Sequence, residues 1–390
     1  MAVTCAPPGA SFSFEASLPA PLGEVIRWLA AAGPPAATGP SPSASAPGGP
    51  PGPLFCTFDP ALLAILRGHR LTPLVYWRLT QTDAWGEVHP DWRPALAHDY
   101  ALALREGARQ DREAGEVVAA LQAAGLEVIL LKGADLRLRL YRDPALRPMS
   151  DLDLLVAKAQ VCPTQTALQA LGYRLSPLCG DPRPGFRERF ANEVMFEPSG
   201  SRRLSIDLHW ELWSGAGFYR LPFSHLAASA PQIDFHGIPA QVLSPEHTVI
   251  HLALHLFEDF YGVIQMVDLL DFLGASDVDW RVFQEEVEQF HCQGPVGLVL
   301  HRVAALAPGL LPPAVLADLA AYRPTLLENL ILTRKLGYIT GYLPLLRHYS
   351  VGSRLFYLAA KLWPDRQYLT QSLRVPGRAA YLRQFLQKVF

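Results

Sequence analysis

Apolar residues recur every three or four positions over most of the chain, and this pattern predicts a largely helical protein. A short helix is expected over residues 21–32 and a long one over 92–124, which Gly125 is placed to end. Apolar stripes broken at Pro73 begin after residue 60. From residue 245 onward the same periodicity predicts six further helices, over 246–260, 263–273, 280–290, 297–307, 313–322 and 326–342.

Residues 126–156 form the segment around which the rest of the chain is expected to be organised. They read as a short apolar strand over 126–131, a tight turn, a helix, a loop and a second strand. The second strand carries Asp151 and Asp153. Because residues two apart in a strand point to the same face, these carboxylates should project together while Leu152 faces the core.

Two later strands complete the expected sheet. They cover residues 193–196 and 204–210, and a helix over 164–171 precedes them. In the second of these strands apolar residues alternate with Asp207 and His209, which predicts one apolar and one polar face. The pattern as a whole predicts the α+β class, with a small mixed β-sheet between a helical N-terminal lead-in and a mostly helical C-terminal domain.

The domain organisation is expected to follow these patterns. Residues 1–53 form an N-terminal segment, in which 31–53 consist almost only of Pro, Gly, Ala and Ser. Such a segment cannot bury enough apolar surface to offset its conformational entropy, so a disordered linker is expected. A helical lead-in (54–125), a sheet-bearing core (126–243) and a helical C-terminal domain (244–390) would follow.

Composition narrows the class of protein. Half of the 390 residues are hydrophobic, and 34 basic residues nearly balance 36 acidic ones, which argues against a global nucleic-acid footprint. Five scattered cysteines without a CxxC pair fit a reducing compartment better than a disulfide scaffold or a zinc site. The sequence shows neither a signal-peptide pattern nor an apolar stretch long enough to span a membrane, so a cytoplasmic protein is expected.

The carboxylate pair indicates a metal site. Two carboxylates on one strand face repel each other, and burial without compensation would cost several kcal/mol per ion. A divalent cation between Asp151 and Asp153 would remove this cost. Mg²⁺ suits the position, because it takes few protein carboxylates and completes its octahedron with water and substrate phosphates. We therefore expect Mg²⁺ as the cofactor, with Mn²⁺ as the alternative.

Four motifs together carry a resemblance to a known family. They are LLKGADL (130–136), RPMSDLDLLV (147–156), SIDLHWEL (205–212) and LSPEHTVIHLALH (243–255). The chain resembles the bacterial family of uncharacterised nucleotidyltransferases, which belongs to the polymerase-β-like nucleotidyltransferase superfamily. The resemblance covers about residues 54–273.

The resemblance implies a metal-dependent transfer of a nucleoside monophosphate from a nucleoside triphosphate such as ATP, with release of pyrophosphate. Asp151 and Asp153 would hold the metal ions that bridge the triphosphate. Asp207 would complete the metal site and help to deprotonate the attacking hydroxyl. His209 shares the strand face of Asp207 and is expected to support the ligands by hydrogen bonding, with a packing role as the alternative.

The same resemblance implies a nucleotide-binding role for four residues. Gly133 would form the tight turn in which backbone N–H groups approach phosphate oxygens. Ser150 would bind a phosphate oxygen, and Lys132 and Arg147 are the nearest cations, with a surface position as the alternative for each. The sequence departs from the superfamily pattern in two ways. Ala134 stands where Ser or Gly is usual, and the first aspartate follows the glycine by 18 positions, a longer interval than in many members.

A histidine series in the next helix leaves two interpretations open. His247, His251 and His255 recur four residues apart on one helix face, a spacing that can bind zinc. The residues between them are apolar, which favours a partly buried packing face, and His251 or His255 is a candidate to line the site as a hydrogen-bonding partner. Asp268 is expected to make either a structural hydrogen bond or a substrate contact.

The C-terminal stretch from residue 342 carries eight basic side chains against the single acidic Asp365, interleaved with aromatic residues. An acidic partner, a nucleic acid or a membrane surface would suit it. A helical cap whose basic side faces solvent is the favoured interpretation.

Three hypotheses for the function follow. The first is a Mg²⁺-dependent nucleotidyltransferase that modifies a hydroxyl of a small molecule or of a peptide or protein; the weak basic field disfavours a long nucleic acid. The second is a catalytically silent nucleotide-binding or interaction module, against which three converging carboxylates argue. The third takes residues 151–153 as the DxD motif of a metal-dependent glycosyltransferase, but helices occupy the region where that class has its nucleotide-sugar domain.

Overall fold

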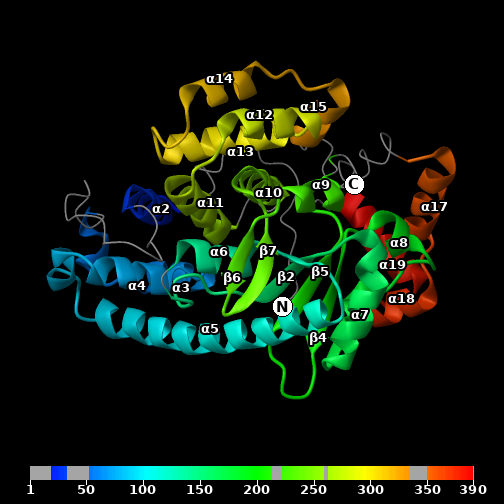
Figure 1. Cartoon of the computed structure of the whole chain (residues 1–390), viewed down its shortest axis with the longest axis horizontal. Coiled ribbons are helices and arrows are strands. Elements are labelled where there is room, and N and C mark those ends of the chain that lie inside the picture. The colour runs from blue at the N-terminus through cyan, green and yellow to red at the C-terminus, as the bar shows by residue number, and fades with distance from the viewer. Residues whose placement is uncertain are drawn as a thin grey trace.

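Figure 1 shows the computed structural model of the chain, in which helices surround a central β-sheet. This arrangement confirms the predicted α+β class. The predicted linker (31–53) falls almost wholly outside the described residues, as does the predicted helix 326–342 beyond residue 333. The division of the chain into four segments stays a prediction. The described residues are 19–32, 52–141, 143–212, 219, 221–258, 262–333 and 349–389.

The sheet has seven strands in the order β3-β4-β5-β2-β1-β7-β6. The pairs β2–β5 and β1–β7 are parallel, whereas the other neighbours are antiparallel, so the sheet is mixed as the sequence predicts. The strands are β1 (Ile129–Leu130), β2 (Asp151–Leu155), β3 (Tyr173–Leu175), β4 (Glu193–Pro198), β5 (Ser205–His209), β6 (Gln232–Phe235) and β7 (Ile238–Val242).

The strand predicted over 126–131 is too long, because β1 pairs only at Ile129 and Leu130. Directly after Leu131 the chain turns into helix α6, although the Leu131 N–H still donates to the carbonyl of Asp153 at 3.1 Å. The sequence pattern also does not single out β3, β6 and β7. The first two lie at the edges of the sheet with mostly exposed or half-buried side chains, and Pro239 interrupts the third.

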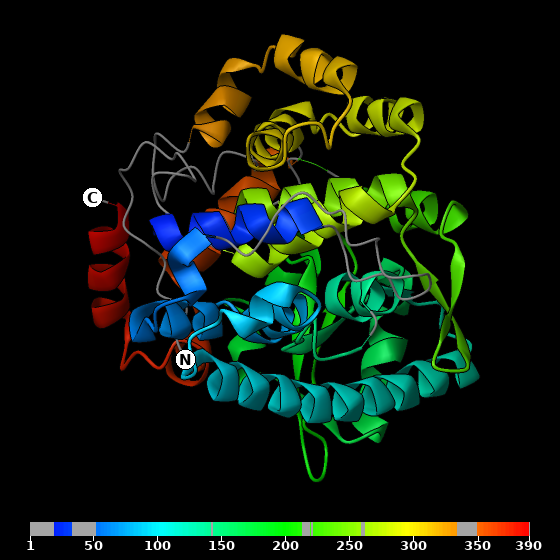
Figure 2. The ribbon, with the colours of Figure 1, turned by 90° about the vertical axis from the view of Figure 1, so that its left-hand side faces the viewer.

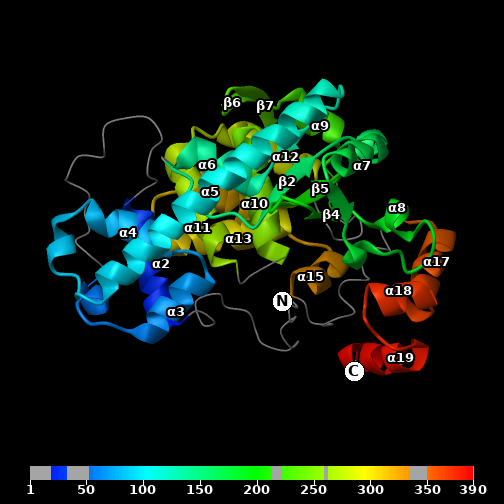
Figure 3. The same ribbon diagram turned by 90° about the horizontal axis from the view of Figure 1, so that it is seen from below.

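One face of the sheet is apolar and is covered by two helices. α5 (Trp92–Ala123) crosses this face and ends at Gly125, whose φ of 71° suits the predicted helix stop, and α7 (Val161–Ala170) lies beside it (Figures 1 and 3). Alternate residues of the central strands pack beneath these helices, which confirms the predicted alternation. The residues in this layer include Leu152, Leu154, Val194, Phe196, Ile206 and Leu208 from the sheet and Val117, Val118, Leu121 and Leu168 from the helices.

The opposite face carries the polar residues of β2 and β5, and helices from two distant parts of the chain close it. α6 (Lys132–Leu140) packs against α11 (Val263–Ala275), and α11 packs against α10 (Pro245–Glu258). α2 (Ala20–Ala32), which confirms the predicted N-terminal helix, lies against α11 and α13 (Figure 2). A single hydrophobic cluster joins these helices, so the N-terminal helix belongs to the core of the C-terminal half.

The other predicted helices are confirmed with small shifts. α7 and α13 begin three or four residues before their predicted starts, because Pro163 and Pro295 lie in the first helical turn, where a missing N–H breaks no hydrogen bond. The remaining helices are α3 (Pro60–Gly68), α4 (Thr72–Thr80), α8 (Phe186–Phe190), α9 (Phe223–Ala228), α12 (Trp280–Gln289), α13 (Gln293–Leu306), α14 (Pro313–Ala321), α15 (Leu326–Leu332), α17 (Val351–Leu362), α18 (Arg366–Gln371) and α19 (Arg378–Val389).

The basic C-terminal stretch forms a group of helices at one end of the molecule (Figure 1). Phe356 and Tyr357 of α17 pack against Phe190 of α8, and the ammonium of Lys361 lies 5.4 Å from the ring centre of Phe186. The solvent face of α17 is apolar rather than basic, because Arg354 and Lys361 are half-buried whereas four apolar side chains along one stripe are exposed. These are Val351, Leu355, Leu358 and Leu362.

Candidate active site

The parallel pairing of β2 with β5 brings two of the predicted carboxylates together. In this register Asp153 lies directly beside Asp207, and Leu155 lies beside His209. One ligand atom from each of Asp153, Asp207 and His209 falls within 4.8 Å of the other two. Asp151 projects to the same face two residues earlier on β2. The sheet register therefore assembles the three predicted carboxylates and the predicted histidine in one place.

Asp207 is the least compensated of these carboxylates. Its Oδ1 atom is buried and has no hydrogen-bond partner among the described residues. Burial raises the pKa of Asp207 to about 7, and the neighbouring charges of Asp153 and Asp151 act in the same direction. Burial and the charge of Asp153 also raise the pKa of Asp151, against a side-chain hydrogen bond from Ser150. The cluster thus holds more negative charge at Asp207 than its protein neighbours neutralise.

Asp153 is held by two cationic partners. The Nζ atom of Lys132 lies 2.8 Å from Asp153 Oδ1, and the Nε2 atom of His209 lies 3.0 Å from the same oxygen. Although burial opposes ionisation of Asp153, Lys132 and His209 outweigh it and hold the pKa of this carboxyl well below its usual range. Burial likewise opposes the charge on Lys132, but the contact with Asp153 raises the Lys132 pKa. Lys132 therefore lies in the predicted site, where its ammonium group forms an ion pair with Asp153.

Glu193 is a member of this cluster that the sequence analysis did not assign to the site. The β4–β5 register places Glu193 directly beside His209, and its Oε2 lies 2.9 Å from His209 Nδ1. Because both ring nitrogens of His209 have carboxylate partners, the pKa of His209 is raised to about 9 even though burial lowers it. This contact depends on how β4 is aligned with β5. The local sequence around Glu193 predicts that the residue lies in a strand, but not which residue of the neighbouring strand it contacts.

The turn before α6 is shaped by a close backbone approach. Lys132 adopts a φ of 45°, in the left-handed region that few side chains favour. At Gly133 a Cβ atom would lie 2.7 Å from Cγ and 2.9 Å from Sδ of Met149, so a larger residue would displace the Met149 side chain. Packing against Met149 thus favours glycine in the predicted tight turn.

Arg147 makes a buried bidentate ion pair with Asp268 of α11. Its Nε lies 2.7 Å from Asp268 Oδ1 and its Nη2 lies 2.7 Å from Asp268 Oδ2, while Nη1 donates to the carbonyl of Pro148 at 2.8 Å. Nη1 also lies 3.6 Å from the position of a Cβ atom at Gly133. Asp268 thus makes the structural contact that was one of its two predicted roles. The contact of Arg147 with a triphosphate stays a prediction. Nη1, the guanidinium nitrogen nearest to Gly133, is the atom that would make this contact.

A second arginine fixes the loop between α6 and β2. Arg137 donates from Nε at 3.1 Å and from Nη2 at 3.0 Å to the carbonyl of Arg147, and Nη1 pairs with Asp111 of α5. Gln110 of α5 donates to the carbonyl of Met149 at 3.1 Å. These residues carry no local sequence signal of a role at the site, because their partners are 10 to 39 positions away.

Two of the three histidines of α10 face the acidic cluster. The rings of His251 and His255 stack with centroids 6.3 Å apart, and both ring nitrogens of His251 are buried without a hydrogen-bond partner in the described part of the chain. Burial, reinforced by the charge of Lys132, lowers the pKa of His255 to about 3 and that of His251 well below its ordinary value. These rings are therefore neutral. His247, at the start of α10, joins a different group of residues.

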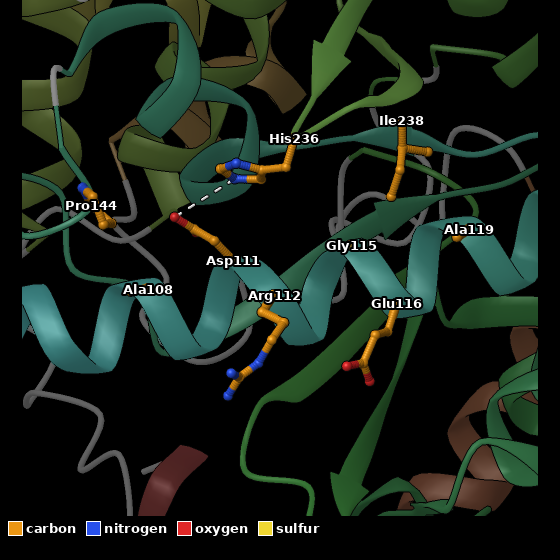
Figure 4. A pocket seen from close by; sticks show the side chains of 9 residues that line it. All are labelled: Ala108, Asp111, Arg112, Gly115, Glu116, Ala119, Pro144, His236 and Ile238. Carbon is orange, nitrogen blue, oxygen red and sulfur yellow. Dashed lines mark ion pairs between the residues drawn. The ribbon is translucent and has the colours of Figure 1, made fainter.

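A hollow of about 670 Å³ lies elsewhere, along α5 (Figure 4). Apolar and small residues such as Ala108, Pro144 and Ile238 form most of its lining, and His236 Nε2 lies 3.7 Å from Asp111 Oδ2 at one side. The lining comes from α5, the loop after α6 and the turn into β7 rather than from the polar strand face. We therefore place the candidate active site at the carboxylates.

The comparison with protein families agrees with this placement. The family model described as uncharacterised nucleotidyltransferase matches residues 59–308 of the chain. The protein belongs to this family. None of the curated proteins compared with the chain matches it. Over the residues that the structure describes, no helix has both the length and the apolar character that a membrane span requires.

In this member of the nucleotidyltransferase family, the charge balance of the site fits a divalent cation. Four carboxylates surround two cationic side chains, while Arg147 and Asp268 neutralise each other and the α10 histidines are uncharged. The buried Oδ1 of Asp207 offers a lone pair that no described donor uses. The residues of the cluster are Asp151, Asp153, Asp207 and Glu193 against Lys132 and His209.

The raised pKa of His209 predicts a pH dependence of stability. A group whose folded-state pKa is about 9, against an ordinary 6.5, stabilises the fold fully below pH 6.5 and loses this contribution as the pH rises through 9. In EDTA, the unfolding free energy of the wild-type protein should therefore fall as the pH rises from 6.5 to 9.5. This fall should exceed that of His209→Gln by on the order of 2–3 kcal/mol. Urea unfolding at several pH values measures this difference, and parallel pH profiles of the two proteins would contradict it.

Proposed function

We propose that this protein is a Mg²⁺-dependent nucleotidyltransferase that transfers a nucleoside monophosphate from a nucleoside triphosphate to a hydroxyl group. The acceptor is a small molecule or a peptide or protein. The observation that carries the proposal is the β2–β5 register, which sets Asp153 beside Asp207 with a buried, unpartnered carboxylate oxygen. Membership in a nucleotidyltransferase family supplies the reaction class.

The residues of the cluster have distinct roles in this proposal. Asp151, Asp153 and Asp207 would hold Mg²⁺, which would supply positive charge to neutralise the charge that develops on the triphosphate during transfer. The acceptor oxygen forms a bond to the α-phosphorus, the bond from this phosphorus to the oxygen that leads to the β-phosphate breaks, and pyrophosphate leaves. The acceptor proton passes to Asp207 Oδ1, which is the carboxylate oxygen with no described donor.

Residues around the turn before α6 would bind the triphosphate. Lys132 has its ammonium on Asp153 and lies at the N-terminus of α6, so it is placed to offset the charge on the leaving pyrophosphate. Gly133, which has no Cβ atom, would let phosphate oxygens approach the backbone N–H groups of this helix end. His209 and Glu193 orient Asp153 through one chain of hydrogen bonds. Ser150 supports Asp151 in the same way.

The weak net charge of the chain supports a small or proteinaceous acceptor. With 34 basic and 36 acidic residues, the protein lacks the strong positive field that a long nucleic acid would require.

The test is turnover of nucleoside triphosphates by the purified full-length protein. We expect Mg²⁺-dependent release of pyrophosphate from at least one of the four triphosphates, stopped by EDTA and lost in Asp151→Asn. Asp277→Asn, at an exposed aspartate, is the matched control and should retain activity. An α-phosphate label shows whether the protein itself serves as an acceptor. Mg²⁺-dependent binding without turnover would favour a silent nucleotide-binding module, and no binding of any triphosphate would refute the proposal.

A further inference from the structure

A second group of metal-binding side chains lies outside the carboxylate cluster. It consists of His225 on α9, His247 on α10 and Glu286 on α12, and one ligand atom from each falls within 4.8 Å of the other two. His225 Nε2 lies 2.8 Å from Glu286 Oε2, and His247 Nε2 lies 3.2 Å from the same oxygen. Three elements that are separate in the sequence therefore converge on one carboxylate oxygen.

Hydroxyl groups offer partners to one ring nitrogen of His247. Nδ1 lies 3.2 Å from the hydroxyl oxygens of both Ser229 and Ser244, so it can donate its proton to either. In that tautomer Nε2 carries the lone pair and points to Glu286. The side chain is 3% exposed, and Nε2 has no hydrogen-bond partner within the described part of the chain. A buried nitrogen lone pair that faces a carboxylate is unfavourable unless a cation lies between them.

The separations of the two histidine nitrogens from Glu286 Oε2 are close to those of a tetrahedral ion. Zn²⁺ binds histidine nitrogen and carboxylate oxygen at about 2.0–2.2 Å, so the ligand atoms of a tetrahedral site lie roughly 3.3 Å apart. The observed separations from Glu286 Oε2 are 2.8 Å to His225 and 3.2 Å to His247. Only a small outward movement of His225 is needed to admit an ion, and its side chain is one-third exposed.

We infer that His225, His247 and Glu286 form a second metal site, which binds Zn²⁺ and ties α9 to α10 and α12. Two neutral imidazoles and one carboxylate are donors that zinc accepts, whereas Mg²⁺ prefers oxygen ligands alone. Phe290 packs against both imidazole rings, with centroids 5.1 Å from His225 and 6.5 Å from His247, and so limits their rotation. α9 has only six residues, so a bond to zinc gives this short helix a fixed position on α10.

Zinc binding to the full-length protein tests this inference. The protein is treated with EDTA, dialysed and titrated with Zn²⁺ in millimolar Mg²⁺, which competes for the carboxylate cluster. Bound zinc is measured by elemental analysis, and stability is measured by thermal unfolding. We expect the wild-type protein and Asp207→Asn each to bind one zinc ion and to unfold at a higher temperature with it. Glu286→Gln and His247→Gln should lose both effects.

Two controls make the outcome specific. His98→Gln, at an exposed histidine of α5, should bind zinc like the wild-type protein. His225→Gln changes a partly exposed ring, so it tests the site even if the variants at the buried positions do not fold. Wild-type protein without bound zinc would overturn the inference, and so would zinc binding that Asp207→Asn abolishes and Glu286→Gln retains. Neither readout depends on nucleotide turnover.

Discussion

Asp207→Asn should lower kcat for pyrophosphate release by about 10³-fold or more, because it removes both a metal ligand and the acceptor of the proton. The same substitution should make the metal-free protein more stable. Asp207 is a poorly compensated carboxylate whose pKa is raised to about 7, so a neutral amide of the same shape relieves repulsion from Asp153 and Asp151. We expect a gain of about 1–3 kcal/mol in the unfolding free energy at pH 8.

The two effects are measured on the same preparations, by steady-state turnover and by urea unfolding in EDTA. Mg²⁺ should raise the stability of the wild-type protein and leave that of Asp207→Asn unchanged, because the variant lacks the ligand. Asp277→Asn replaces an exposed aspartate and should change neither property. If Asp207→Asn destabilises the metal-free protein, or keeps more than about a tenth of wild-type kcat, the carboxylate does not have the proposed role.

The Arg147–Asp268 ion pair is expected to dominate the stability of the loop before β2. The two side chains are 8% and 1% exposed, so removal of one partner leaves a charge buried without compensation. Arg147→Met and Asp268→Leu should each lower the unfolding free energy by about 3–5 kcal/mol. The double variant should lose much less than the sum, because it buries two apolar side chains in place of one unpaired charge.

An exposed ion pair provides the control. Arg67 and Asp99 lie 2.8 Å apart, but the Arg67 side chain is 48% exposed, so Arg67→Met should cost less than about 1 kcal/mol. Additive losses in the Arg147 and Asp268 variants would show that the pair is not coupled. The double variant also tests nucleotide binding: a raised KM for the triphosphate in a protein of near-normal stability would show that Arg147 contacts the substrate.

The sequence predicts the composition of the candidate site better than its arrangement. The i, i+2 spacing of Asp151 and Asp153 and the alternation around Asp207 place each carboxylate on a polar strand face, because strand periodicity is a local property. Which strands become neighbours is decided by packing across the whole sheet. Glu193 therefore emerges as a partner of His209 only once β4 is paired with β5.

Long-range contacts also explain why the sequence alone does not decide the roles of Arg147 and of the three histidines of α10. Arg147 has the charge and position of a phosphate-binding residue, yet its main partner lies 121 positions away on another helix. The even spacing of His247, His251 and His255 predicts one shared face. In the structure His247 turns to Glu286 of α12, whereas His251 and His255 face Lys132 and Asp153. The helix sequence alone does not determine which elements pack against α10, so it does not predict that these rings have different partners.

The packing of α2 and α6 against α11 has a consequence for how the protein folds. Both early helices are synthesised long before α11, so they cannot bury their apolar faces in their final partners until much of the chain has emerged. The Arg147–Asp268 contact also closes a long loop, because the two residues are 121 positions apart. A nascent chain that stops short of α11 contains all three carboxylates but lacks the ion pair that positions the loop before β2. The proposed nucleotide transfer therefore becomes available only late in synthesis.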